Sequence, residues 1–174
     1  IEDLISYRRK NENLLVRSYE KSLNISITGS WRIIVYKSLI DDIEHLALIK
    51  GVVTSKVKTM VRVHSFNPIS DIFEGLSPDG QNNLIFKAMK KIDGNNSGVI
   101  IIINDSYKDF LSKKLKLDEE INTKHKTSLR QYGVGAQILS DLGVKKMTLL
   151  SNSKKKAIAL KGFDLSIIDW ERLD

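Results

Sequence analysis

One run of six residues, Gly-Val-Ile-Ile-Ile-Ile at positions 98–103, most constrains the fold of this chain. β-branched residues favour extended backbone, and a strand that is apolar on both faces must be covered on both faces. Such strands occur in sheets flanked by helices. The run is also far shorter than the roughly 20 apolar residues of a membrane-spanning helix. It therefore indicates an α/β domain with this strand in its core.

Apolar residues recur at helical spacing on both sides of this strand. The stripe that precedes it contains Leu84, Ile85, Ala88, Met89 and Ile92. The stripe that follows it contains Leu129, Tyr132, Ala136, Leu139 and Leu142. We expect the first helix to begin near Ser77, with Pro78 at its first helical position, and the second to end at Gly143.

The other predicted strands cover residues 31–38, 44–51, 57–64, 145–150 and 164–170, and a short helix is expected at 153–162. In 57–64, valines and threonine alternate with Lys58, Met60, Arg62 and His64, which predicts one apolar and one polar face. Early strands followed by a βαβαβ pattern indicate a mixed sheet flanked by helices. Residues 1–24 are expected to be an exposed helix or interdomain arm, and residues 25–174 the folded domain.

Composition limits the chemistry available to the 174 residues. The chain has no cysteine, which excludes disulfides, thiolate catalysis and cysteine-based zinc sites. Its three histidines, His45, His64 and His125, lie in separate segments, so a structural role is the simpler reading of each. The formal charge of +7 leaves open a nucleotide- or RNA-binding module, although lysines spread along the chain give the same number. Glycines 133 and 135 fit close helix packing better than a phosphate loop.

Four stretches, EHLALIKG, VRVHS, RQYGVGAQILSDLGVKKMTLLSN and GFDLSIIDW, resemble GTP cyclohydrolase II, the first committed enzyme of riboflavin synthesis. They follow the order and spacing of that family from about Ile25 to Trp170. The resemblance implies the family's mixed-sheet fold. It also suggests that the first 17 residues join this domain to dihydroxybutanone-phosphate synthase, as in fused bifunctional proteins.

The family's catalytic zinc is held by three cysteines, and the resemblance places Asn67, Pro78 and Gly80 at those positions. Proline and glycine side chains offer no metal ligand, and one asparagine oxygen is a poor ligand for zinc. Asp71 matches the aspartate of the family's L-T-G-D segment. We therefore expect no zinc, and magnesium only together with bound GTP.

The nucleotide-binding motifs also depart from the family. Its R-Q-E-G-R-G segment, which binds phosphates, corresponds here to residues 104–109, where two aspartates replace arginine and glycine chemistry and repel a triphosphate. The family's D-x-R corresponds to Ser128 and Arg130. Its T-N-N-P-K turn, which lines the base pocket, corresponds to Ser151, Asn152 and Lys155, and Arg62 completes the expected nucleotide-binding set.

The leading hypothesis is a catalytically degenerate domain that acts as a structural, dimerising or regulatory module of the fused synthase. One alternative is an active hydrolase that converts GTP to a ring-opened diaminopyrimidine phosphate, formate and pyrophosphate, either without a metal or with His64 and Asp79 as replacement ligands. The other is the basic nucleotide- or RNA-binding module. The expected partners are the synthase domain, a second copy, since family members are usually dimers, and weakly bound GTP. Without targeting signals or an apolar span, a cytoplasmic location and no membrane contact are expected.

Overall fold

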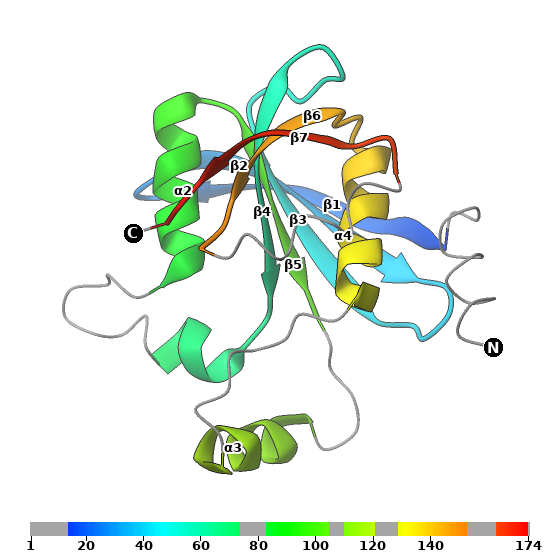
Figure 1. Cartoon of the computed structure of the whole chain (residues 1–174), viewed down its shortest axis with the longest axis vertical. Coiled ribbons are helices and arrows are strands. Elements are labelled where there is room, and N and C mark those ends of the chain that lie inside the picture. The colour runs from blue at the N-terminus through cyan, green and yellow to red at the C-terminus, as the bar shows by residue number, and fades with distance from the viewer. Residues whose placement is uncertain (1–13, 74–82, 105–109, 121–128, 153–162, 174) are drawn as a thin grey trace.

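The computed structural model describes residues 14–73, 83–104, 110–120, 129–152 and 163–173. These residues form a seven-stranded mixed sheet with helices on both sides (Figure 1), which confirms the expected fold class. The strand order is β1-β2-β3-β5-β4-β6-β7. The pairs from β1 to β5 are antiparallel, and the pairs from β5 to β7 are parallel. None of the described helices is long and apolar enough to cross a bilayer.

Strands β2 to β7 and helices α2 and α4 follow the predicted order along the chain, whereas β1, η1 and α3 were not predicted. The strands are β1 (Leu15–Ile25), β2 (Gly29–Ser38), β3 (Glu44–Lys50), β4 (Lys58–Ser65), β5 (Gly98–Ile103), β6 (Lys146–Leu150) and β7 (Ser166–Glu171). The helices are the π-helical segment η1 (Ile69–Phe73), α2 (Leu84–Asn95), α3 (Phe110–Glu120) and α4 (Leu129–Asp141).

The first strand corrects one expectation. Residues 15–24, expected to form an exposed helix or arm, belong to β1, which pairs antiparallel with β2 and forms one edge of the sheet. Arg17 Nε donates to Asp141 Oδ2 of α4 over 2.7 Å, and Tyr36 Oη donates to the same oxygen over 2.6 Å. Pairing with β2 and this link to α4 are tertiary contacts that local charge patterning does not reveal. The preceding residues, 1–13, lie outside the described chain.

The start of α2 corrects another. Asn83, and not Ser77, is its N-cap, because the Asn83 side chain accepts hydrogen bonds from the backbone N–H groups of Ile85 and Phe86, each over 3.0 Å. Asparagine satisfies the free N–H groups of a first turn at least as well as serine. The helix ends before Asn96, which adopts the left-handed conformation with φ of 61°. Residues 74–82, with Ser77 and Pro78, and the helix expected at 153–162 lie outside the described residues.

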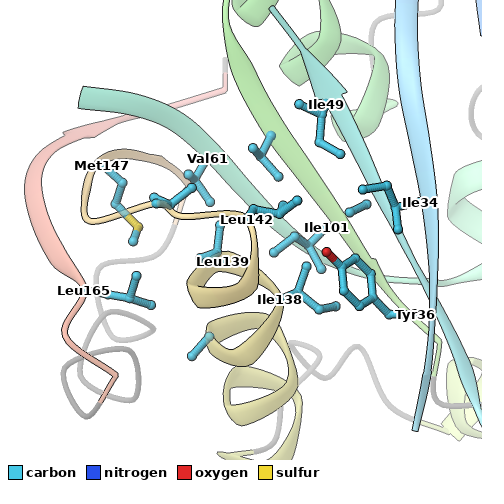
Figure 2. Close-up of a cluster of buried hydrophobic side chains, with 14 of the residues drawn as sticks. Ile34, Tyr36, Ile49, Val61, Ile101, Ile138, Leu139, Leu142, Met147 and Leu165 are labelled. Carbon is cyan, nitrogen blue, oxygen red and sulfur yellow. The ribbon is translucent and has the colours of Figure 1, made fainter. Parts of the chain in front are cut away.

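The two helical stripes cover opposite faces of the sheet. Figure 2 shows Ile138 and Leu139 of α4, and Leu142 directly after it, directed at the side chains of the central strands. On the other face, Ala88, Met89 and Ile92 of α2 pack against Trp31, Leu48 and Ile100. A Cβ on Gly135 would lie 3.2 Å from Val63 Cγ1, which supports the close-packing interpretation of this glycine. Strand β5 is thus covered on both sides, as its sequence predicted.

Candidate functional site

The candidate site lies where β4, β5 and β6 end, because the carboxyl ends of parallel strands meet at one edge of a sheet. The predicted alternation along β4 is correct, with Val61 in the core under α4. The opposite face is not solvent-exposed, however. Arg62 retains 8% of its accessible surface and His64 retains 7%, so these polar side chains are buried and need internal partners.

His64 and Asp71 form the centre of this site. His64 Nε2 lies 2.9 Å from both carboxylate oxygens of Asp71, and the Asn67 backbone N–H donates to Asp71 Oδ2 over 2.8 Å. Arg62 Nη2 lies 3.5 Å from His64 Nδ1. Because a guanidinium only donates, Nδ1 is the acceptor, and the ring proton sits on Nε2, which donates to Asp71. Both ring nitrogens therefore have protein partners, and the segment that contains η1 is tied to β4.

The described residues of the expected nucleotide-binding set form hydrogen bonds with neighbouring strands and with the segment after β7. Arg62 Nη1 donates to the Leu150 carbonyl over 3.0 Å, which links β4 to β6. The Ser151 carbonyl accepts from Trp170 Nε1 over 2.7 Å. The Asn152 amide makes two bonds with Leu173, accepting from its N–H over 2.7 Å and donating to its carbonyl over 3.4 Å. These contacts hold β6, β7 and the segment after β7 together.

A second histidine, His45 of β3, lies beside the end of β5. His45 Nδ1 accepts a hydrogen bond from the Asn104 backbone N–H over 3.2 Å. Burial lowers the pKa of His45 to about 4, because an imidazolium loses its hydration there. At neutral pH this histidine is an uncharged acceptor. It positions the first residue of the segment that corresponds to the family's phosphate loop, whose residues 105–109 lie outside the described chain.

Of the three positions that the resemblance assigns to zinc ligands, Asn67 alone lies in the described residues. Asn67 is 8% exposed, and its N–H group is bonded to Asp71. In the part of the chain that the structure describes, no group of three or more histidine, aspartate or glutamate side chains could hold a metal ion. Together with the cysteine-free sequence, this donor set does not fit a three-thiolate zinc site.

Other predicted residues cannot be placed. Pro78, Gly80, Asp79, Ser128 and Lys155 lie outside the described residues. Arg130 is the second residue of α4, and its side chain also lies outside the part of the chain that the structure describes. Their roles stay predictions.

Two contacts in the site were not predicted from the sequence: the pairing of Asp71 with His64, and that of Leu173 with Asn152. The resemblance singled out Asp71 for its family position but gave no reason to pair it with His64, seven positions earlier across a turn. Leu173 had no signal at all, yet it is 3% exposed and packs in the cluster under α2. A single apolar residue near the end of a sequence has no periodicity from which burial can be predicted.

Comparison with known proteins agrees with the resemblance. A family model described as GTP cyclohydrolase II matches residues 16–172. The riboflavin biosynthesis protein RibBA of Chlorobium phaeovibrioides is 34% identical over 181 residues, which cover 97% of this chain and 44% of the relative. RibBA of Bacillus cereus strain AH187 is 36% identical, with 97% of this chain and 45% of the relative covered.

A solved structure is also similar. The crystal structure of RibBX from A. baumannii, described as a two-domain 3,4-dihydroxy-2-butanone 4-phosphate synthase, matches with a TM-score of 0.60 and 31% identity. The match covers 98% of this chain and 43% of that chain. This chain therefore spans less than half the length of these relatives.

Proposed function

The chain belongs to the GTP cyclohydrolase II family, and from that premise we propose that it is a catalytically degenerate member that serves a dihydroxybutanone-phosphate synthase as a structural or regulatory module of riboflavin biosynthesis. The sequence retains the packed core of the family, while its ligand positions have changed together. The observation that carries the proposal is the donor set: Asn67, Pro78 and Gly80 stand where the resemblance places three thiolates.

The contacts of His64 argue against the alternative of an active hydrolase with replacement ligands. A histidine binds a metal through a ring nitrogen that carries no proton. In His64 that nitrogen is Nδ1, which faces the guanidinium of Arg62, and Nε2 donates to Asp71. Binding a cation through Nδ1 would require the contact with Arg62 to break and would place the cation beside that guanidinium, which electrostatics opposes.

The residues expected to bind the nucleotide support the same conclusion. The side-chain amide of Asn152, the donor and acceptor that a purine edge would need, is already bonded to the backbone of Leu173. Two of the hydrogen bonds that this amide can make are therefore used within the protein. In the phosphate segment, Asp105 and Asp109 add negative charge where a triphosphate would lie.

The first test is GTP turnover by the purified protein with magnesium and added zinc, with formate release as the readout. We expect no formate above a blank, while a cysteine-containing relative assayed in parallel releases it. Formate production that Arg130→Ala abolishes would show that the chemistry survives without the thiolates, and the proposal would then be wrong.

The module role has its own test. Synthase activity and assembly are measured for the full-length protein and for a form that lacks residues 14–174, so that no part of β1 is left without its partner strand. We expect lower synthase activity or altered assembly in the shortened form. Identical behaviour of the two forms would refute a structural or regulatory role, whatever the result with GTP.

The basic-module alternative and the expected homodimer stay predictions. Affinity for single-stranded RNA that falls steeply with salt concentration would favour the former, because phosphate contacts release counterions. Light scattering on the eluting protein gives the mass that decides the latter.

A further inference from the structure

One part of the sheet is apolar but uncovered. Helix α2 lies over β4 and β5, on the face that carries Ile100. On the same face, a row of opposed residues crosses to the β1 edge: Ile102 lies opposite Leu46, Leu46 opposite Val35, and Val35 opposite Tyr19. Residues opposed in a sheet share a face. The row therefore runs from under α2 to the edge strand.

Exposure in this row is greatest at the β1 edge. Ile102 and Val35 are partly buried, Leu46 is 37% exposed, and Tyr19 is 62% exposed. Leu23, opposite Trp31, adds a further apolar side chain that is 42% exposed, and Lys21 lies between the two. We call Tyr19, Leu23, Val35 and Leu46 the open sheet face. Clustered apolar side chains on a sheet face mark a surface that another body covers.

We propose that the open sheet face docks the synthase domain of the same polypeptide, which rests on the proposed function and on the expected order in which that domain precedes residue 1. More than half of each similar two-domain protein lies outside the region that matches this chain. A domain attached ahead of β1 would be tethered directly to the strand that carries Tyr19 and Leu23. A short tether gives an effective concentration in the millimolar range.

The size of the surface favours this occupant over a free second copy. Stable association of separate chains buries about 1,600 Å² in total. Contacts between domains of one chain bury about 600–1,500 Å² in total. Four side chains, of which Val35 is partly buried and the other three are 37–62% exposed, fit the smaller requirement. Their mixed character, with an exposed tyrosine and a neighbouring lysine, is also typical of an interdomain contact.

The test uses the full-length two-domain protein and the variant Tyr19→Ser with Leu46→Ser. The matched control is Ile168→Ser in β7, which removes a 53% exposed side chain from the opposite edge of the sheet. Small-angle scattering gives the radius of gyration, sedimentation gives the mass, and circular dichroism checks that each variant is folded. Each lost anchor should weaken docking about tenfold.

We expect a larger radius of gyration at unchanged mass in the double variant, and wild-type values in the control. A fall in mass would show that a second copy covers this face and would overturn the proposal. Unchanged radius and mass would overturn it as well. Formate release by the wild-type protein would refute catalytic degeneracy but would leave the scattering result standing, so the two failures are distinguishable.

Discussion

The His64–Asp71 pair is the most consequential contact at the scale of single residues. Both side chains are buried, and Asp71 also accepts the Asn67 N–H. A buried imidazole left without its acceptor bears the cost of desolvation, which is larger than the net value of the bond. The pair therefore holds η1 on β4.

The first prediction concerns this pair. Asp71→Ala should lower the free energy of unfolding by about 2–4 kcal/mol, because it leaves His64 Nε2 and the Asn67 N–H unsatisfied. The control Glu20→Ala removes the partner of Arg32 in an exposed ion pair and should cost less than about 0.5 kcal/mol. Urea denaturation measures both. Equal effects in the two variants would mean that the buried pair contributes nothing special.

The second prediction concerns pH. The pKa of His45 is about 4 in the folded protein against 6.5 ordinarily, so the unfolded chain binds more protons between these values. Stability is then fully present above pH 6.5 and declines as the pH falls toward 4, by about 1–3 kcal/mol from this residue. His45→Gln should make the dependence of stability on pH shallower across that window. A slope identical to that of the wild type would assign the loss to other groups.

At the scale of elements, the two glycines of α4 form a matched pair. A Cβ on Gly133 meets nothing within 4 Å, whereas a Cβ on Gly135 lies 3.2 Å from Val63 Cγ1. Gly133→Ala should stabilise the protein by about 0.5–1 kcal/mol, because alanine loses less backbone entropy in a helix. Gly135→Ala should gain less or destabilise, since Val63 must move. Thermal unfolding measures the stability of both variants. An equal gain in the two would show that Gly135 is not required for packing against Val63.

The segment after β7 is the other element with a testable role. Leu173 fills the cluster between α2 and the sheet, and its backbone is bonded to Asn152. Leu173→Ala should cost about 2–4 kcal/mol through lost burial and the cavity that remains. Ile168→Ala, at a 53% exposed position in β7, is the control and should change stability by less than about 1 kcal/mol. Similar costs in denaturant melts would show that Leu173 does not anchor the end of the sheet.

Helix and strand types were predicted well where burial imposes a clear period. The run in β5 and the stripes of α2 and α4 specify their elements because each has one dominant packing requirement. β1 lacks that signal, since most of its side chains are exposed and only Leu15 enters the core. Its pairing with β2 comes from backbone hydrogen bonds, to which side-chain patterns are a weak guide.

At the scale of the whole molecule, ligand binding has a direct thermodynamic signature. A ligand that binds only the folded state raises stability by RT ln(1 + [L]/Kd). We expect GTP at millimolar concentration, with magnesium, to leave the melting temperature unchanged, because the Asn152 amide is already bonded to Leu173 and carboxylates lie in the phosphate segment. ATP under the same conditions controls for ionic effects. A GTP-specific rise that grows with concentration would establish residual binding and contradict this expectation.

The sequence by itself determined the fold class, the cores of the main elements and the absence of thiolate donors, because these depend on residue type and spacing alone. Only the tertiary structure decided how the polar residues are used. His64 and Asp71, Arg62 and Leu150, and Asn152 and Leu173 meet through pairing of β4, β6 and β7 and through the turn after β4. Such contacts depend on strand order and on the path of the chain between strands, which local patterns do not encode.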